Sequence, residues 1–187
     1  MRLNALANNQ PAQEASAAVL KRFRLIFKAV QQHAHWVEKN CGLSNAQLWV
    51  VWELAQNPGI RLTELAKIMT IHQSTASNLL EKLVKKGLVR REKRSEDQRV
   101  VSLFLTEAGL QVLASAPKPA RGILQHALFN LPDTTLVSLA KNLDELIEAM
   151  GIRDDAAAMQ PLAVLAKNPA GKPPAQSSLA ANPGVAE

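Results

Sequence analysis

The chain has 187 residues, a net charge of +6 and 47% hydrophobic residues, a composition that suits one compact domain with tails. We find no secretory leader and no apolar run of transmembrane length, so we expect a cytoplasmic protein that makes no membrane contact. One cysteine excludes an internal disulfide, and the four histidines have no metal-ligand spacing, so we expect no metal and no cofactor.

The first helix is expected over residues 16–43. The residues before it are polar and alanine-rich without a sustained period, and they predict a flexible arm over 1–15. Apolar residues from Val19 to Val37 recur at helical spacing and give this helix a wide apolar stripe. A second helix is expected to start at Ser44, a good N-cap residue, and to stop before Pro58 and Gly59.

Two short helices separated by a turn follow. The first carries an apolar stripe from Leu62 to Met69, with Thr63 as its expected N-cap. Residues 70–72 do not extend the stripe and form the turn. The second helix is expected over residues 73–85, where basic residues and then Gly87 end it. This order is typical of a helix-turn-helix.

The second of these helices has a polar, uncharged face near its N-terminus. These side chains have the length and chemistry to contact base edges in a major groove, where the start of a recognition helix lies. A Ser/Thr/Asn-rich helix start can also serve only as a cap, so the context of the neighbouring elements matters. The residues of this face are Gln73, Ser74, Thr75, Ser77 and Asn78.

A β-hairpin with a charged tip is expected next. The β-prone runs 88–91 and 100–105 flank the loop from Arg94 to Arg99. An arginine on such a loop can enter a narrow minor groove, and Asp97 is well placed to orient the guanidinium of Arg99. Residues 61–99 hold ten Lys/Arg against five Asp/Glu, so most of the chain's positive charge lies here, as phosphate binding requires.

The remaining residues predict further helices and a tail. A helix opens at Thr106, is interrupted by Pro117 and Pro119, and resumes through Phe129. A last amphipathic helix is expected over 133–150. The tail 153–187 holds half of the chain's ten prolines and no aromatic residue, and we expect it to be disordered.

These elements predict a mainly α fold with a small β-hairpin wing, that is, a winged helix-turn-helix over residues 44–105. The N-terminal helix (16–43) and the C-terminal helices (106–152) hold more apolar surface than this unit can cover, which favours a homodimer through these helices. A twofold dimer also sets two recognition helices about 34 Å apart, as two successive turns of DNA require. The alternative is a monomeric bundle that buries both helices internally.

The stretch ELAKIM…QSTASNLLEKLVKKGLVRRE…SEDQRVVSLFLTEAG resembles the MarR family of bacterial transcription regulators, over roughly residues 17–150. The resemblance implies that Lys82 contacts a phosphate and Arg99 the minor groove. It also implies base contacts from four residues of the polar helix face, Gln73, Ser74, Thr75 and Asn78. Asn78 stands where many relatives carry arginine, and asparagine suits adenine rather than guanine.

The resemblance further implies a small aromatic acid or phenol as effector, bound in a cleft between the dimer helices and the DNA reader. A charged His33 can receive a ligand carboxylate, and a neutral one can be an ordinary core residue. Large aromatic residues are also common in cores. The candidate residues of the cleft are Arg24, His33, Trp36, Trp49 and Trp52.

Three classes of function were compared. The first is a sequence-specific regulator of transcription, a homodimeric repressor on a pseudo-palindromic double-stranded operator. The second is a non-enzymatic winged-helix protein that binds DNA architecturally or contacts protein partners; its DNA binding would be salt-dependent and blind to sequence. The third is an enzyme, which we do not expect, because no nucleophile, base and oxyanion donor converge. Redox sensing through Cys41 is an alternative mode of control.

Overall fold

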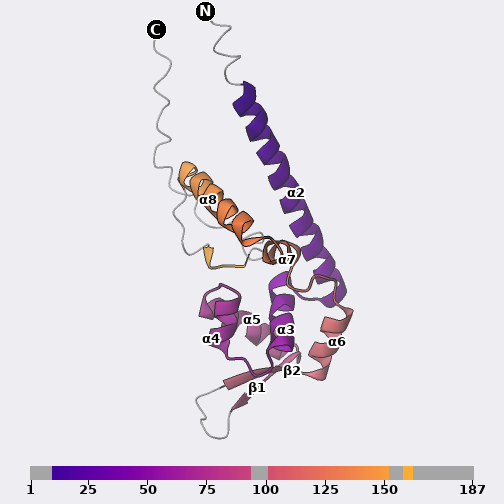
Figure 1. Cartoon of the computed structure of the whole chain (residues 1–187). Coiled ribbons are helices and arrows are strands. Elements are labelled where there is room, and N and C mark those ends of the chain that lie inside the picture. The colour runs from indigo at the N-terminus through magenta and orange to yellow at the C-terminus, as the bar shows by residue number, and fades with distance from the viewer. Residues whose placement is uncertain (1–9, 94–100, 152–157, 162–187) are drawn as a thin grey trace, which may run out of the picture.

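The computed structural model describes residues 10–93, 101–151 and 158–161. The winged-helix unit lies at one end, with the β-hairpin at its outer edge, and α2 and α8 extend away from it at the other end (Figure 1). The elements in chain order are α2 (Gln10–Cys41), α3 (Asn45–Gln56), α4 (Leu62–Ile68), α5 (Gln73–Lys85), β1 (Val89–Lys93), β2 (Val101–Leu105), α6 (Glu107–Ser115), α7 (Ile123–Phe129) and α8 (Asp133–Ala149). The predicted mainly α fold with a β-hairpin is confirmed.

Helix α2 begins at Gln10, so residues 10–15, which we assigned to a flexible arm, are helical. Pro11 lies in the first turn, where its missing N–H has no intrahelical partner to lose. The alanines that follow favour a helix, even though they add nothing to an apolar period. The rest of the predicted arm, residues 1–9, lies outside the described residues.

Helix α3 begins as predicted. The hydroxyl of Ser44 accepts the backbone N–H of Gln47 at 3.3 Å, and the Gln47 side chain accepts the N–H of Ser44 at 2.9 Å. This reciprocal pair is a capping box. The expected N-cap at Thr63 is wrong, because α4 already includes Leu62 and Thr63. There the Glu64 carboxylate accepts the N–H of Arg61 at 3.0 Å and satisfies the helix start.

The turn between α4 and α5 covers Met69 to His72, which is one residue more than the predicted Thr70 to His72. Thr70 has a φ of 50°, which reverses the chain sharply at a non-glycine residue. Helix α5 has the predicted bounds, and Gly87 follows its end with a φ of 70°. This left-handed position suits glycine and releases the chain into β1.

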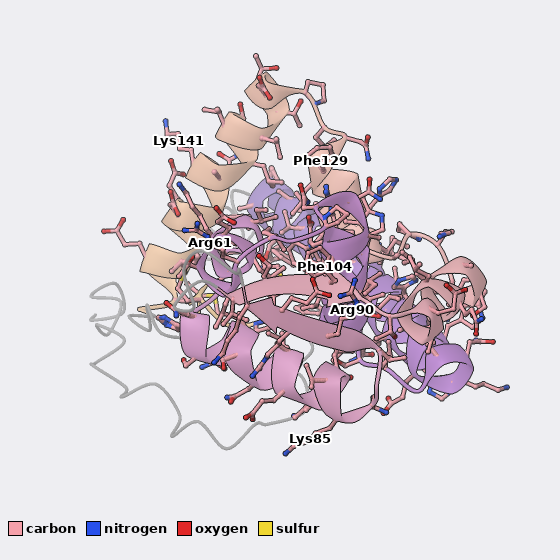
Figure 2. All side chains as sticks on the ribbon, turned by 90° about the horizontal axis from the view of Figure 1, so that it is seen from below. Arg61, Lys85, Arg90, Phe104, Phe129 and Lys141 are labelled. Carbon is pink, nitrogen blue, oxygen red and sulfur yellow. The ribbon has the colours of Figure 1, made fainter. Side chains whose placement is uncertain are left out.

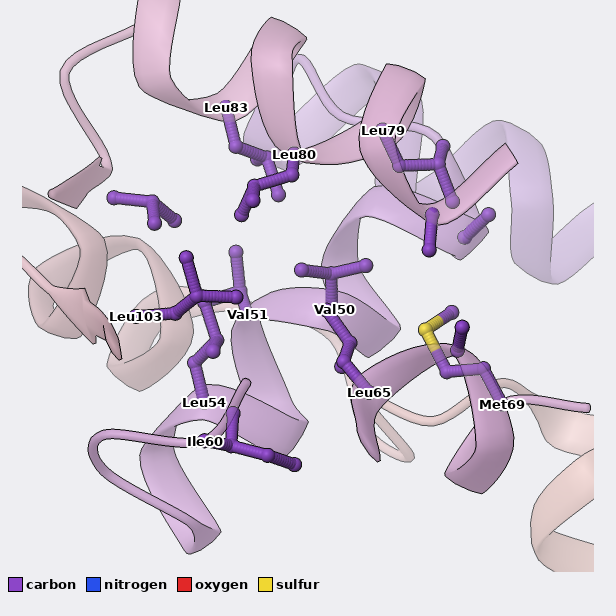
Figure 3. Packing of buried hydrophobic residues seen from close by; sticks show 14 of the residues in the cluster. Val50, Val51, Leu54, Ile60, Leu65, Met69, Leu79, Leu80, Leu83 and Leu103 are labelled. Atoms are coloured by element: carbon purple, nitrogen blue, oxygen red, sulfur yellow. The ribbon is translucent and has the colours of Figure 1, made fainter. Parts of the chain in front are cut away.

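The core of the winged-helix unit forms where α3, α4, α5 and β2 meet. Side chains from all four elements point toward one another in Figure 3. Val50, Leu65, Leu80 and Leu83 are each 0–1% exposed, which ties the two short helices to α3. Because α5 is held by this inner face, its opposite face has a fixed orientation toward solvent.

Strands β1 and β2 pair antiparallel, with Val89 opposite Leu105 and Lys93 opposite Val101. The segment before α4 joins the same hairpin: Gly59 donates its N–H to the Leu103 carbonyl at 2.8 Å, and Leu103 donates to the Ile60 carbonyl at 3.1 Å. The hairpin is therefore bonded to the chain between α3 and α4, and its base cannot swing freely.

Thr106 caps the start of α6, and its hydroxyl accepts the N–H of Gly109 at 3.2 Å. The segment of residues 116–122, which we call the connector, links α6 to α7 where the two prolines predicted an interruption. No helix in the described part of the chain is both long and apolar enough to span a membrane.

Candidate nucleic-acid interface

Helix α5 presents its polar residues outward. Gln73, Ser74 and Asn78 are exposed, and Thr75 and Ser77 are half-buried. Among the described residues, no side chain is hydrogen-bonded to the three exposed ones, so their donors and acceptors are available to a ligand. All five residues predicted from the sequence therefore lie on one helix, with those at positions 73, 74 and 78 most accessible.

Positive charge extends this face toward the C-terminus of α5. Ser74, Asn78 and Lys82 follow one another at four-residue spacing, so their side chains line one side of the helix. Lys85 is exposed and points away from the body of the protein (Figure 2). Glu81 is also exposed, next to Lys82 in the chain. Its negative charge repels phosphate, so only part of this side of α5 suits a phosphate contact.

The hairpin adds exposed cations beside α5. Arg90, Arg91 and Lys93 on β1 are all exposed. Arg90 is held in place: its guanidinium lies 4.8 Å from the ring centre of Phe104 on β2, and it forms an ion pair with Glu92 (Figure 2). The predicted tip residues Arg94, Asp97 and Arg99 lie outside the described residues, and their roles stay predictions.

One further contact lies at the start of α5. The backbone N–H of His72, the N-cap of α5, donates to the carbonyl of Met159 at 3.2 Å. Residues 158–161 therefore lie beside the turn that precedes α5. Except for residues 158–161, the predicted tail of residues 153–187 lies outside the described residues.

A second feature, remote from α5, is an open groove of about 660 Å³ along α2. We call it the α2 groove, and it is lined by His33, His35, Trp36, Lys118, Ile123 and small or amide residues of α2. Trp36 is 52% exposed, and its ring meets His33 edge to face. The Trp36 indole provides a stacking surface at this open space, and Lys118 provides positive charge.

His33 is the most buried polar residue of this groove, with 6% of its surface exposed. Burial lowers the pKa of His33 below its ordinary value, and a hydrogen bond to the backbone carbonyl of Pro119 opposes this. Its Nε2 has no partner among the described residues. A neutral imidazole with one free ring nitrogen can still bind a polar group of a ligand.

Of the five residues expected to form an effector cleft, the groove brings together His33 and Trp36. Arg24 is exposed on α2 and does not line it. Trp49 and Trp52 lie on α3 against other partners: the Trp49 indole donates to Glu53 at 2.7 Å, and the Trp52 ring faces the Arg121 guanidinium at 4.3 Å.

Sequence reasoning missed His35, Lys118 and Ile123 in this groove, and it missed Arg121 altogether. The three groove residues come from two segments distant in sequence, and no period links them. The one available signal was the Pro-Lys-Pro run, which placed Lys118 in an irregular segment between helices.

Cys41 is half-buried at the end of α2, and burial raises the pKa of its thiol. A thiol with a raised pKa is a poor thiolate source, which argues against redox control through this residue. Within the described residues, no group of three or more His, Cys, Asp or Glu side chains is arranged to hold a metal ion.

Comparison with known proteins gives consistent matches. A sequence model of the MarR family matches residues 43–101. The transcriptional regulator HosA of Escherichia coli is 33% identical over 97 residues, which cover 51% of this chain and 72% of HosA. The regulator Hpr of Geobacillus thermodenitrificans is 29% identical over 143 residues, which cover 73% of this chain and 68% of Hpr.

Among solved structures, a MepR-like protein complexed with pseudoligands is similar in fold. It has a TM-score of 0.51 and 23% identity, and the match covers 73% of this chain and 97% of that protein. This likeness is one of fold, and it agrees with the winged-helix fold described above.

Proposed function

The chain belongs to the MarR family of winged-helix transcriptional regulators, and from this premise we propose that it binds a pseudo-palindromic site in double-stranded DNA as a homodimer. The winged-helix unit, residues 44–105, reads the DNA. Helix α2 and helices α6 to α8 hold the two copies together. Repression of transcription, relieved by a small aromatic effector, completes the proposal.

The observation that carries DNA reading is the exposed, uncharged face of α5. Gln73, Ser74 and Asn78 offer donors and acceptors of the kind that pair with base edges. The inner face of the same helix is fixed by the buried core, so these groups are held in one orientation. Lys82 and the β1 cations supply phosphate contacts around them. An architectural binder has no need of such a polar face.

Selection from a random duplex pool tests this proposal. We expect enrichment of two inverted half-sites with centres about one helical turn apart, since a twofold dimer presents two recognition helices at that spacing. Binding should also weaken with salt, because lysines and arginines displace counterions. A pool that yields no preferred sequence, with binding that depends on salt alone, contradicts sequence-specific regulation and favours architectural binding.

A homodimer is supported by the apolar surface that one copy leaves open. On α2, Leu20 is 51% exposed and Phe27 62%; on α8, Val137 is 70% and Ile147 46% exposed. These residues belong to the two elements that extend away from the winged-helix unit (Figure 1). Apolar groups repeated along two helices are the surface that a second copy can cover.

For the effector we propose the α2 groove. His33 and Trp36 provide a polar ring nitrogen and an aromatic face, and Lys118 provides positive charge for a carboxylate or phenolate. Lys118 of the connector lines the groove, and Ala116 and Ala120 of the same segment pack against Leu48 of α3. A ligand in the groove would therefore contact a segment that packs against the winged-helix unit. Release from DNA follows only if the ligand prefers the form that cannot bind DNA.

Benzoate and phenol are the probes for this site. Each should quench the fluorescence of Trp36 and weaken binding to the selected duplex, and Trp36→Phe should remove the quenching signal. His33→Ala should reduce the fold change that the probe causes in DNA affinity; because His33 also bonds Pro119 of the connector, that change is measured against the variant's own affinity without the probe. If neither probe changes DNA binding or the melting temperature, this part of the proposal is wrong.

A further inference from the structure

The connector lies between α2 and α3. The proposed function assigns α2 to the dimer and α3 to the unit that reads DNA. Ala116 and Ala120 are buried at 6% and 4% exposure, in one cluster with Val37 of α2 and Leu48 of α3. The carbonyl of Pro119 accepts a hydrogen bond from His33 on α2. The connector is therefore attached to α2 on one side. On its other side, Arg121, which follows Ala120, contacts Glu53 and Trp52 of α3.

The contact between Arg121 and α3 includes a buried carboxylate, that of Glu53. Glu53 lies on α3 with 2% of its surface exposed, and its Oε1 is 3.6 Å from Nη2 of Arg121. The same oxygen accepts the Trp49 indole N–H at 2.7 Å. A carboxylate so deeply buried is tolerated when it is paired and hydrogen-bonded, so Arg121 and Glu53 depend on each other.

Aromatic rings enclose the other surface of Arg121. Its guanidinium carbon lies 4.3 Å from the centre of the Trp52 ring on α3 and 4.4 Å from that of Phe129 at the end of α7. A planar guanidinium stacks on such rings, and a lysine ammonium does not reproduce this. One side chain of the connector thus touches both the helix at the base of the winged-helix unit and the helix that leads to α8.

The contact is not optimal as a source of stability. The ion pair is 3.6 Å long, and the buried Nε of Arg121 has no partner among the described residues. Buried ion pairs contribute little net stability compared with apolar packing, and their best-supported use is to fix one arrangement over its alternatives. In this protein, the contacts of Arg121 can fix the orientation of α3 relative to α2 and α7.

We propose that Arg121 is a positioning residue that fixes the orientation of the winged-helix unit on the dimer helices and so sets the spacing of the two recognition helices. This inference rests on the proposed dimeric binding to two half-sites. Helix α3 packs through Leu48 against the connector and through Val50 and Val51 against the core side of α5. Because α5 is attached through α3, a small rotation at Arg121 becomes a larger displacement of α5. Contacts within one half-site do not depend on this orientation, whereas binding to two half-sites does.

The test uses the full chain with Arg121→Met and with the double variant Glu53→Gln/Arg121→Met, which leaves no uncompensated carboxylate. Arg121→Lys keeps the charge and removes the stacking geometry. The probes are the duplex selected by the unaltered chain, a duplex with one half-site, and duplexes whose half-site spacing is changed by one or two base pairs. Thermal melting of each variant reports folding separately.

We expect the unaltered chain to prefer the selected spacing by about tenfold or more, since joined sites gain from effective concentration only when the geometry fits. The double variant should bind the single half-site within about twofold of the unaltered chain, yet discriminate among spacings by less than about threefold. Arg121→Lys should fall between the two. A merely structural role would lower half-site and two-site affinity in the same proportion.

Two results would overturn the inference: a double variant that keeps the original spacing preference, or one that loses half-site binding together with cooperative melting. A different failure concerns the proposed function. If the unaltered chain selects no paired half-sites, the dimeric reading of DNA is wrong, and the inference about spacing fails with it.

Discussion

Gly109 lies against the backbone carbonyl of Leu88 so closely that a Cβ on this glycine would be 2.3 Å from the carbonyl oxygen. The two residues join the start of α6 to the chain between α5 and β1. The same carbonyl accepts the backbone N–H of Thr106 at 3.0 Å. Helix α6 is therefore fixed to the base of the wing by backbone contact, and only a residue without a side chain fits.

Gly109→Ala should destabilise the protein. The added methyl group meets backbone rather than a flexible side chain, so α6 must shift, which costs about 1–3 kcal/mol as in other overpacked sites. Chemical denaturation monitored by circular dichroism measures the loss. The exposed Gln111→Ala on the same helix is the control and should stay within about 0.5 kcal/mol of the original. An unchanged midpoint for Gly109→Ala would contradict the close contact.

Ser44→Ala should also destabilise, through the start of α3. Loss of the hydroxyl leaves the N–H of Gln47 without its acceptor, and the expected cost is about 0.5–2 kcal/mol. Ser44→Asp should retain most of the stability, because a carboxylate caps equally well and favours a helix N-terminus. Equilibrium unfolding of both variants separates a cap from a generic surface change; equal losses would rule out capping.

Asn78→Ala should alter which base is preferred at one position of the selected duplex. If the amide makes two hydrogen bonds to a base, the loss is about 1–3 kcal/mol for that base and small for the others. Lys82→Ala is the matched contrast: it should weaken binding to all sequences and reduce the salt slope by about one. Binding to single-base variants of the duplex, titrated by fluorescence anisotropy, measures both. A uniform loss from Asn78→Ala would assign it to backbone positioning.

Leu20→Gln/Phe27→Gln should dissociate the proposed dimer. The two side chains lie on one side of α2, seven residues apart, and are half or more exposed in a single copy. Burial of a large apolar side chain contributes about 1.5–3 kcal/mol, so the dimer constant should weaken more than about tenfold. Sedimentation velocity measures this, with the exposed Lys21→Gln as control. An unaltered chain that sediments as a monomer at all concentrations would disprove the dimer.

His33 should make stability depend on pH. Its pKa in the folded chain is lowered from 6.5 by burial, so the unfolded chain binds more protons in the window between the two values. The free energy of unfolding therefore rises with pH through that window and is flat above about 6.5. The contribution of His33 is lost as the pH falls from 6.5 through the lowered pKa of the folded chain. His33→Gln should flatten this dependence, as measured by melting temperature from pH 5 to 8. Gln32→Ala, an exposed and uncharged neighbour on α2, should leave the pH dependence unchanged.

The periods and caps of the sequence determined most of the secondary structure. The start of α3 at Ser44 and the end of α5 before Gly87 depend on partners within a few residues, and such local interactions can be inferred from sequence. The polar face of α5 could be predicted for the same reason, because helical spacing alone assigns residues to faces. Two helix starts were predicted wrongly. The alanines near residues 10–15 favour an earlier start of α2, and the Glu64 carboxylate, which accepts the N–H of Arg61, caps α4 before Thr63.

Tertiary structure alone decided which distant segments meet. His33 contacts Pro119, Glu53 faces Arg121, and Gly109 rests on Leu88, and no period in the sequence relates these pairs. Each contact depends on how several helices pack together, since side chains reach only a few ångströms and chain separation does not determine their distance. For that reason the sequence could identify the face that we propose reads DNA, whereas the α2 groove and the attachment of the connector required the folded chain.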